Sequence, residues 1–97
     1  MSKITESARG RECQVRLPGI CNWDNETTVF AHVPGAGMAL KTRPGGVDLG
    51  AYCCSSCHDE VDRRTRNMDV NDARRFFLDG VIRTLHTLSE EGIIKCA

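Results

Sequence analysis

The clearest hydrophobic pattern lies in the C-terminal third of the chain, where apolar residues recur at helical spacing. Asn71 stands directly before this stretch and is a residue type that caps helices, so the pattern predicts a helix from Asn71 to about Ser89. Gly92 follows at a position suited to ending that helix. One face of the helix would close the core through Phe76, Phe77, Val81, Leu85 and Leu88.

Extended patterns dominate the first third of the chain. The stretch ETTVFAHV is rich in β-branched and aromatic residues and predicts a strand that ends near His32. Val15 and Leu17 alternate with polar residues before Pro18-Gly19, which predicts a short strand running into a tight turn. Together these patterns predict a small α+β protein with an N-terminal β-hairpin.

Composition limits how such a chain can be stabilised. It has 97 residues, 5% aromatic content and nine glycines. One domain over residues 1–97 would therefore have a small hydrophobic core and would need additional stabilisation from cross-links or a bound metal. Six cysteines could provide it, either as disulfides in one of about 15 pairings or as metal ligands. The N-terminus is polar and charged, without the apolar run of a signal peptide or membrane span. We therefore expect a cytoplasmic protein whose reduced thiols hold metal.

Four cysteines have the arrangement of a structural zinc site. Cys13 and Cys21 flank the predicted N-terminal bend, and Cys54 and Cys57 have the spacing with which a helix start presents two thiolates to one ion. The charged run HDEVDRR that follows is typical of a helical first turn. Cys53 could replace Cys54 as a ligand, and the alternative to a shared site is a set of buried free thiols. Four thiolates around Zn²⁺ would tie the hairpin to this helix.

The run from Cys54 to His58 also matches the attachment motif of c-type haem. Met68 could then serve as a second axial ligand. Covalent haem attachment normally occurs outside the cytoplasm, so the zinc interpretation explains more of the chain.

Two histidines indicate chemistry beyond a structural zinc ion. His32 ends the predicted strand and His58 directly follows the last zinc cysteine, so they would lie close together if strand and helix pack together. The glycine- and proline-rich loop between them carries Lys41 and Arg43 and leads to Asp48. A strand histidine, an intervening oxygen ligand and a histidine at a helix start would form a small metal-dependent active site.

At these residues the sequence resembles the HNH, or ββα-metal, endonucleases, many of which carry a four-cysteine zinc site beside their catalytic metal. The order of His32, loop, Asp48 and C-x-x-C-H carries this resemblance. More closely, the run CQVRLPGICNWDNETTVFAHVPGAGMALKTRPGGVDLGAYCCSSCHDEVDRR is similar to the YbcO-type nucleases of phages and prophages, and the similarity continues into GVIRTLHTLSEEG. The resemblance implies a zinc-stabilised treble-clef fold of HNH type with an added C-terminal helix, and hydrolysis of DNA phosphodiester bonds.

The resemblance also implies residue roles. His32 would be the general base that takes a proton from the attacking water, and His58 the helix-borne ligand of a catalytic Mg²⁺ or another divalent metal. Asp62, one turn later, could add an oxygen ligand, and Asp48 falls where the middle asparagine of the HNH pattern is expected. The chain departs from the pattern at Ala31, where many HNH enzymes place a metal-binding aspartate, and has no asparagine between the two histidines. Further candidates for the ligand set are Asp59, Glu26 and His32 itself.

The net charge of the chain bears on whether its partner is a nucleic acid. Thirteen basic and thirteen acidic residues cancel, whereas nucleic-acid-binding proteins are usually basic. An uneven surface could still contact the backbone of duplex or branched DNA without sequence preference. The alternative function is a non-catalytic zinc module that binds DNA or a phage protein.

Asp59 and Glu60 are expected to lie in the first turn of their helix, where acidic side chains interact favourably with the helix dipole. The basic residues that could contact a nucleic-acid backbone are Arg9, Arg11, Arg16, Lys41, Arg43, Arg63, Arg64 and Arg66.

Overall fold

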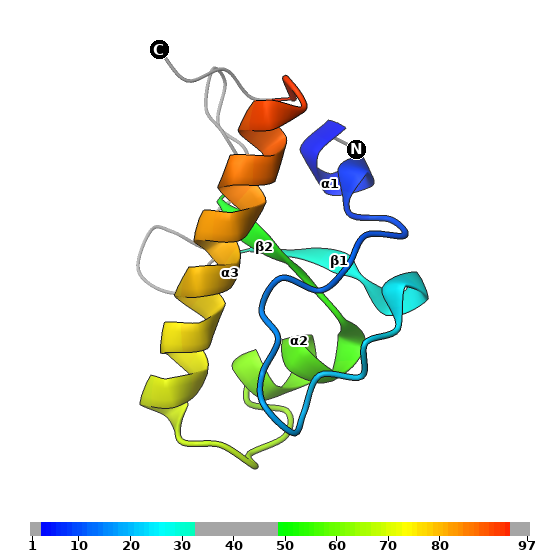
Figure 1. The fold of residues 1–97 in the computed structure, drawn as a ribbon. Helices are drawn as coiled ribbons and strands as arrows, with labels where there is room; N and C mark the ends of the chain where they lie inside the picture. The colour runs from blue at the N-terminus through cyan, green and yellow to red at the C-terminus, as the bar shows by residue number, and fades with distance from the viewer. Residues whose placement is uncertain (1–2, 33–48, 94–97) are drawn as a thin grey trace.

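The computed structural model describes residues 3–32 and 49–93. Two strands form one antiparallel sheet, with a long C-terminal helix along one side of the molecule (Figure 1). The predicted α+β class is confirmed, whereas Lys41, Arg43 and Asp48 lie outside the described residues. The elements are α1 (Lys3–Ser7), the 3-10 helix η1 (Asn25–Thr27), β1 (Val29–His32), β2 (Gly50–Cys53), α2 (Ser55–Val61) and α3 (Val70–Glu90).

The strand predicted to end near His32 is present as β1. It pairs with β2 in a register that runs from Val29 opposite Cys53 to His32 opposite Gly50. Gly50 has no room for a side chain, because a Cβ there would lie 2.3 Å from a carbonyl oxygen of β1. β2 leads directly into α2, for which Cys54 is the N-cap. The sheet therefore carries His32 at one end and the start of the second cysteine pair at the other.

The predicted N-terminal hairpin is wrong, because residues 11–24 contain no strand. They form a loop held between the sheet and α3: the Gln14 N–H donates to the Tyr52 carbonyl (2.8 Å), and the Arg83 guanidinium donates to the Gln14 carbonyl (2.7 Å). Val15 and Leu17 are both fully buried in this loop. Their alternation reflects side chains directed into the core, which needs no strand partner.

Two backbone features let this loop pack closely. The predicted turn at Pro18-Gly19 is confirmed, with the Cys21 N–H donating to the Leu17 carbonyl at 3.0 Å. On α3, Gly80 lies directly against Val15, since a Cβ at Gly80 would be 2.8 Å from Val15 Cγ2. A glycine inside a helix costs about 1 kcal/mol relative to alanine. Here it makes room for the loop that carries the first cysteine pair.

α3 differs from its prediction only at its first residues. Its N-cap is Asp69, whose Oδ2 accepts a hydrogen bond from the Asn71 N–H at 2.9 Å. The prediction that Asn71 caps this helix is therefore wrong, because Asp69, two residues earlier, is the N-cap. The end near Ser89 is confirmed, and Gly92 follows with a left-handed φ of 73°. None of the helices in the described ranges is both long and apolar enough to cross a membrane.

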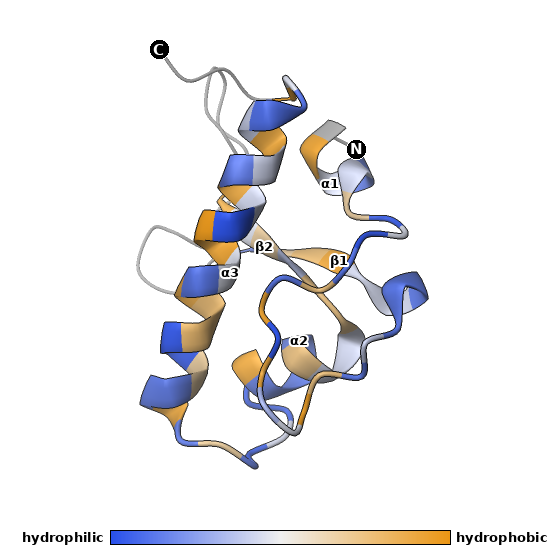
Figure 2. Ribbon diagram, viewed as in Figure 1, coloured by the Kyte–Doolittle hydropathy of each residue, from blue (hydrophilic) through white to orange (hydrophobic). Residues whose placement is uncertain are grey.

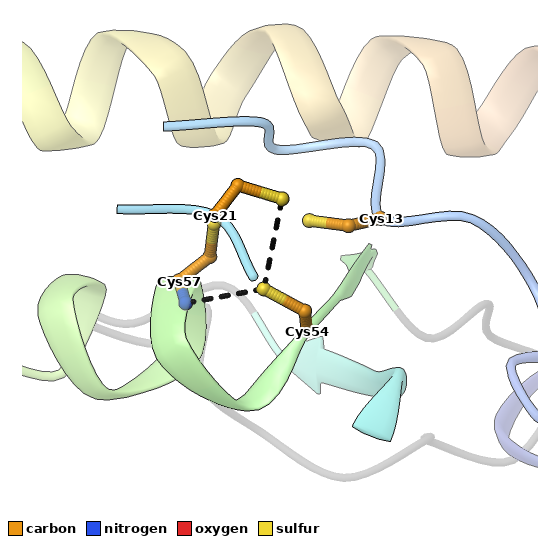
Figure 3. A group of neighbouring side chains, drawn as sticks. All are labelled: Cys13, Cys21, Cys54 and Cys57. Atoms are coloured by element: carbon orange, nitrogen blue, oxygen red, sulfur yellow. Dashed lines mark hydrogen bonds between the residues drawn. The ribbon is translucent and has the colours of Figure 1, made fainter. Parts of the chain in front are cut away.

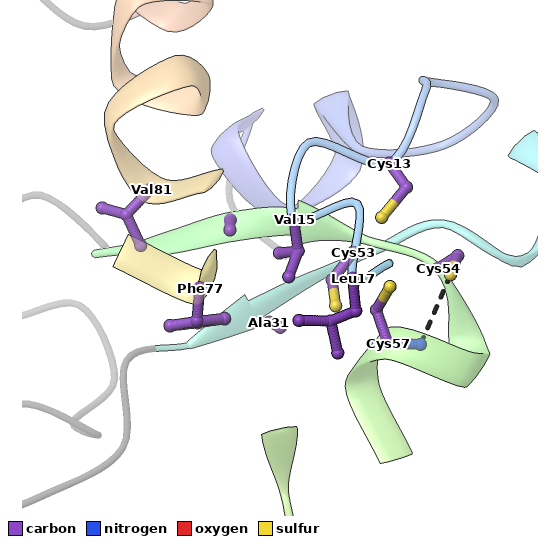
Figure 4. Packing of buried hydrophobic residues seen from close by; sticks show 10 residues of the cluster. Cys13, Val15, Leu17, Ala31, Cys53, Cys54, Cys57, Phe77 and Val81 are labelled. Atoms are coloured by element: carbon purple, nitrogen blue, oxygen red, sulfur yellow. Dashed lines mark hydrogen bonds between the residues drawn. The ribbon is translucent and has the colours of Figure 1, made fainter. Parts of the chain in front are cut away.

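The predicted core face of α3 is buried or partly buried along its length. Figure 2 shows hydrophilic and hydrophobic residues alternating along α3, as expected for a helix covered on one side. The larger apolar cluster surrounds the cysteines between the loop, the sheet and α3 (Figure 4). A smaller cluster lies beside α1 and consists of Ala8, Phe30, Tyr52 and Leu88.

Candidate metal centre and catalytic residues

Segments far apart in the sequence bring four cysteines together. Cys13 and Cys21 lie on the buried loop, Cys54 caps α2 and Cys57 lies in the first turn of that helix. The four side chains converge (Figure 3), and their sulfur atoms all lie within 4.8 Å of one another. Within residues 3–32 and 49–93, no other group of three or more histidine, cysteine or acidic side chains is close enough to share an ion.

The spacing of the sulfur atoms fits tetrahedral zinc. Four thiolates at about 2.3 Å from Zn²⁺ would stand roughly 3.8 Å apart along the edges of a tetrahedron. The sulfurs of Cys21 and Cys54 are 3.8 Å apart. Cys13, Cys54 and Cys57 are buried and Cys21 is half-buried, which suits a closed structural site. The four cysteines could therefore hold a metal ion such as zinc.

Backbone N–H groups approach each of the four sulfur atoms. The Arg16 N–H donates to Cys13 Sγ at 3.5 Å, and the Cys57 N–H donates to Cys54 Sγ at 3.4 Å. Four thiolates around one divalent cation keep a net negative charge, which such N–H dipoles partly offset. The other two sulfurs, of Cys21 and Cys57, are approached by the N–H groups of Trp23 and Leu17.

Two of these donors have a strained backbone. Arg16 and Trp23 have φ angles of 54° and 56°, in the left-handed region that costs a non-glycine residue about 1 kcal/mol or more. In each case the N–H reaches the sulfur of a cysteine two or three residues earlier, Cys13 or Cys21. The strain is therefore tied to the cysteine cluster. The amino-acid sequence gives no sign of this strain, because neither residue is a glycine or an asparagine.

The thiols of the cluster hold their protons unequally. Hydrogen bonds from the Cys53 and Cys57 thiols keep the pKa of Cys13 far below its usual value. The same bonds to Cys13 raise the pKa values of Cys53 and Cys57. Burial raises the pKa of Cys21 to about 11. Because thiols lose their protons when they bind metal, metal binding at this cluster competes with protons.

Cys53 is buried beside the cluster but is not one of its four members. It is the last residue of β2, and its thiol hydrogen bonds to Cys13. Cys54, the next residue, directs its sulfur to Cys21. Of the two alternatives that the sequence left open, the geometry favours Cys54 as the ligand.

His58 and Asp62 lie one turn apart on the same side of α2. His58 Nε2 is 3.1 Å from Asp62 Oδ2, and the two side chains are 28% and 33% exposed. Asp62 is the C-cap of the helix and also lies 3.5 Å from the Arg64 guanidinium. An imidazole and a carboxylate in this arrangement can both contribute ligands to one divalent ion. The pair stands at the protein surface, where a substrate could reach it.

His32 occupies the exposed end of β1, opposite Gly50. Its ring packs edge-on against Phe30, with the ring centroids 5.3 Å apart. Within the described residues, His32 does not join His58 and Asp62 in a group close enough to share one ion. The structure therefore places a His58–Asp62 pair on α2 and a separate histidine on β1.

α2 carries a further carboxylate, Glu60, in a position that differs from its prediction. Glu60 is fully buried near the end of α2, so the expectation that it meets the dipole in the first turn is wrong. It accepts hydrogen bonds from the N–H groups of Asn67 and Met68, both at 2.9 Å, and from the Thr65 hydroxyl at 2.7 Å. Burial alone would raise the pKa of Glu60, but these bonds and the charge of Arg63 outweigh it and lower the pKa. Glu60 thus ties the α2–α3 connection to the helix that bears the candidate catalytic pair.

Several arginines expected to face DNA are engaged within the chain. Arg11 forms a bidentate ion pair with Glu91. Arg64 forms an ion pair with Asp59 at 2.9 Å. The prediction that Asp59 lies in the first turn of α2 and interacts with the helix dipole is therefore wrong. Arg66, by contrast, is exposed. The positive charge available to a phosphate backbone is smaller than the number of arginines suggests.

Nearly the whole chain has counterparts among known proteins. Residues 2–93 match a family described as "Putative nuclease YbcO". Proteins of that name from Escherichia coli (strain K12) and Enterobacteria phage 82 are each 44% identical over 96 residues, which covers 98% of this chain and 99% of the relative. A solved structure described as that of "a putative bacteriophage protein" from Escherichia coli K-12 is also 44% identical, with a TM-score of 0.75 over 91% of this chain and 98% of that one. The chain therefore belongs to the YbcO family, which is named a family of "putative" nucleases.

Proposed function

We propose that this protein is a metal-dependent endonuclease that hydrolyses DNA phosphodiester bonds at an HNH-type, ββα-metal site beside a treble-clef zinc centre. The observation that carries the proposal is the His58–Asp62 pair, which stands on the helix whose start supplies Cys54 and Cys57. The name of the family supports nuclease activity, and a nuclease acts on nucleic acid.

Each candidate residue has a separate task in this proposal. His58 and Asp62 would hold Mg²⁺ or another divalent ion, and Asp48, outside the described residues, is the candidate for a further ligand. When bound, such an ion polarises the scissile phosphate and stabilises the departing 3′ oxygen. His32 accepts a proton from the attacking water, a task suited to an imidazole at neutral pH. Its exposed position on β1 supports this role, since substrate and water can reach the ring.

The four-cysteine centre has a structural task. Its sulfurs are largely buried and are complete as a four-ligand set, so no position remains for a substrate oxygen. A zinc ion held there fixes the buried loop to the start of α2. The orientation of His58 and Asp62 then depends on the centre through the helix that they share.

A second candidate function is a non-catalytic zinc module that binds DNA or a phage protein. It is favoured by the separation of His32 from the His58–Asp62 pair among the described residues. The two functions differ in their requirements, because a binding module needs the zinc centre but neither histidine.

The test is nicking of supercoiled plasmid by zinc-loaded protein, with and without Mg²⁺ or Mn²⁺. Loss of a general base lowers a rate by about 10² to 10⁴, so His32→Ala should cut that much more slowly. His58→Ala should also lose activity and should need more divalent ion to recover part of it. Asn25→Ala, a change at an exposed position on η1, is the matched control and should cut at the wild-type rate.

Three results would separate the candidates. Metal-dependent cutting that only the histidine variants lose supports the nuclease and the role of His32. Equal cutting by wild type and His32→Ala would remove His32 from the mechanism. If no preparation cuts plasmid or branched DNA while wild type and both variants bind it equally, the binding module is the better description.

A further inference from the structure

The outer side of α3 carries a row of exposed residues at intervals of four. Its second and third members are apolar, with Leu78 54% exposed and Ile82 65% exposed. Its ends carry opposite charges, with Arg74 near the start of the helix and Glu90 at its last residue. His86 completes the row and pairs with Glu90 at 2.9 Å. We call these five residues the α3 row.

Among the described residues, neither the core nor the candidate site uses the α3 row. Its residues lie outside both apolar clusters, and α3 packs on the sheet through its opposite side. The other large apolar residues exposed within residues 3–32 and 49–93 are Trp23, in the buried loop, and Val29, on β1. Two large aliphatic side chains on successive turns of one helix form a continuous patch, which water covers at a cost of roughly 25 cal/mol per Å².

The order of charges makes the α3 row complementary to a second copy of itself. If two copies of α3 lie antiparallel about a two-fold axis at Ile82, the two Ile82 side chains meet and each Leu78 meets the stem of the His86 side chain of the other copy. Arg74 of each copy then faces Glu90 of the other, and symmetry makes this contact twice. The two helix dipoles also run in opposite directions, which favours this arrangement.

The geometry of helix packing supports the same arrangement. Residues four apart form the ridges that interdigitate in the commonest class of helix–helix contact. α3 has 21 residues, so it is roughly 32 Å long and can present such a ridge over several turns. A parallel pair would instead place Arg74 beside Arg74 and Glu90 beside Glu90. The charges therefore select the antiparallel pair.

We propose that a second copy of this chain docks on the α3 row to form a two-fold symmetric, antiparallel homodimer. The proposal does not depend on nuclease activity, because the row lies on α3 and the candidate catalytic residues lie on β1 and α2. A contact made mainly by one helix from each copy is small, so the dimer is expected to be weak and concentration-dependent.

Sedimentation equilibrium of the full chain, purified with its metal, tests the dimer over a range of protein concentrations. Ile82→Arg places two like charges at the centre of the contact and should weaken dimerisation at least about tenfold. R74E and E90R should each weaken it by a similar factor, whereas the double variant R74E/E90R should return to within about threefold of wild type. Arg9→Glu, an exposed charge reversal outside α3, is the matched control and should leave dimerisation unchanged.

Circular dichroism and metal content should match wild type in each variant, because all the changed side chains are exposed. A chain that stays monomeric at roughly 500 μM, where a dimer with a Kd of about 100 μM would be largely assembled, would overturn the proposal. A dimer that Ile82→Arg does not weaken must use another surface, and one that the double charge reversal does not restore is not antiparallel.

Discussion

Glu60 shows at the residue scale how one buried carboxylate organises its surroundings. A glutamate in a charge-rich run normally faces solvent, yet this one is fully buried and accepts hydrogen bonds from three residues of the following connection. The pairing of Cys54 with Cys57 and of His58 with Asp62 could be predicted, because the members of each pair are only a few residues apart in the sequence. The role of Glu60 could not, because it depends on which side of α2 the chain later covers.

Glu60→Gln should clearly destabilise the protein at neutral pH. Both carboxylate oxygens accept hydrogen bonds, so the amide NH₂ of glutamine must face a donor whichever way it is placed. Because the folded protein holds the pKa of Glu60 below its usual value near 4.5, ionised Glu60 stabilises the fold above that pH. This contribution is lost as pH falls through the lowered pKa.

The measurement is the urea midpoint of wild type and Glu60→Gln between pH 7 and pH 4. The gap between them should be widest at neutral pH and should narrow at the acid end, while the shared metal centre affects both alike. Asp59→Asn is the matched control, since Asp59 lies on the same helix in a more exposed ion pair with Arg64. A gap that does not change with pH would mean that Glu60 acts by shape alone.

At the scale of elements, the buried loop decides the architecture around the metal centre. Its apolar alternation suggested a strand, but its backbone bonds go to β2 and to α3 instead of to a neighbouring hairpin strand. The strand β1 and the helix α3 were predictable, because each has a periodic pattern of its own. The loop was not, since its conformation depends on Gly80 of a helix more than 60 residues away, against which Val15 packs.

Gly80→Ala should destabilise the protein although alanine is the better helix former. The added methyl group gains about 1 kcal/mol of helix propensity, but its Cβ would lie 2.8 Å from Val15 Cγ2 and 3.0 Å from Val15 Cα. Overpacking of this kind costs about 1–3 kcal/mol, so the net change should be a loss of up to about 2 kcal/mol.

Thermal melts and zinc content together check this prediction. Displacement of Val15 should also weaken metal retention, because Cys13 lies two residues away on the same loop. Asp79→Ala, an exposed change at the preceding position of α3, should leave both quantities unchanged or slightly improved. A Gly80→Ala protein more stable than wild type would show that the loop can move away at little cost.

At the scale of the whole molecule, the cysteine cluster lies within the larger apolar core. A bound zinc ion would join the loop to α2 where few large side chains are available. Zinc binding contributes about 10–16 kcal/mol in zinc-finger peptides, as much as the net stability of a typical domain. The metal would therefore be part of the fold.

Removal of the metal should abolish cooperative unfolding. Treatment with a strong chelator under reducing conditions should flatten the thermal melt, and added Zn²⁺ should restore it with one ion per chain. Cys54→Ser should lose the metal, whereas Cys53→Ser should keep it, because the Cys53 sulfur is not part of the four-ligand group. A chelated protein with an unchanged melting temperature would mean that the cysteines act only as buried apolar residues.

The sequence by itself determined the α+β class, the position of α3, the strand at His32, and the cysteine and His58–Asp62 spacings. These features depend on periodicity and on ligands only a few residues apart. Tertiary structure alone decided that residues 11–24 form a loop and that Glu60 is buried. It also decided that Arg16 and Trp23 adopt left-handed conformations and that Leu78 and Ile82 of the α3 row are exposed. The physical reason is that burial and backbone strain are set by contacts between segments far apart in the chain, and no local pattern records those contacts.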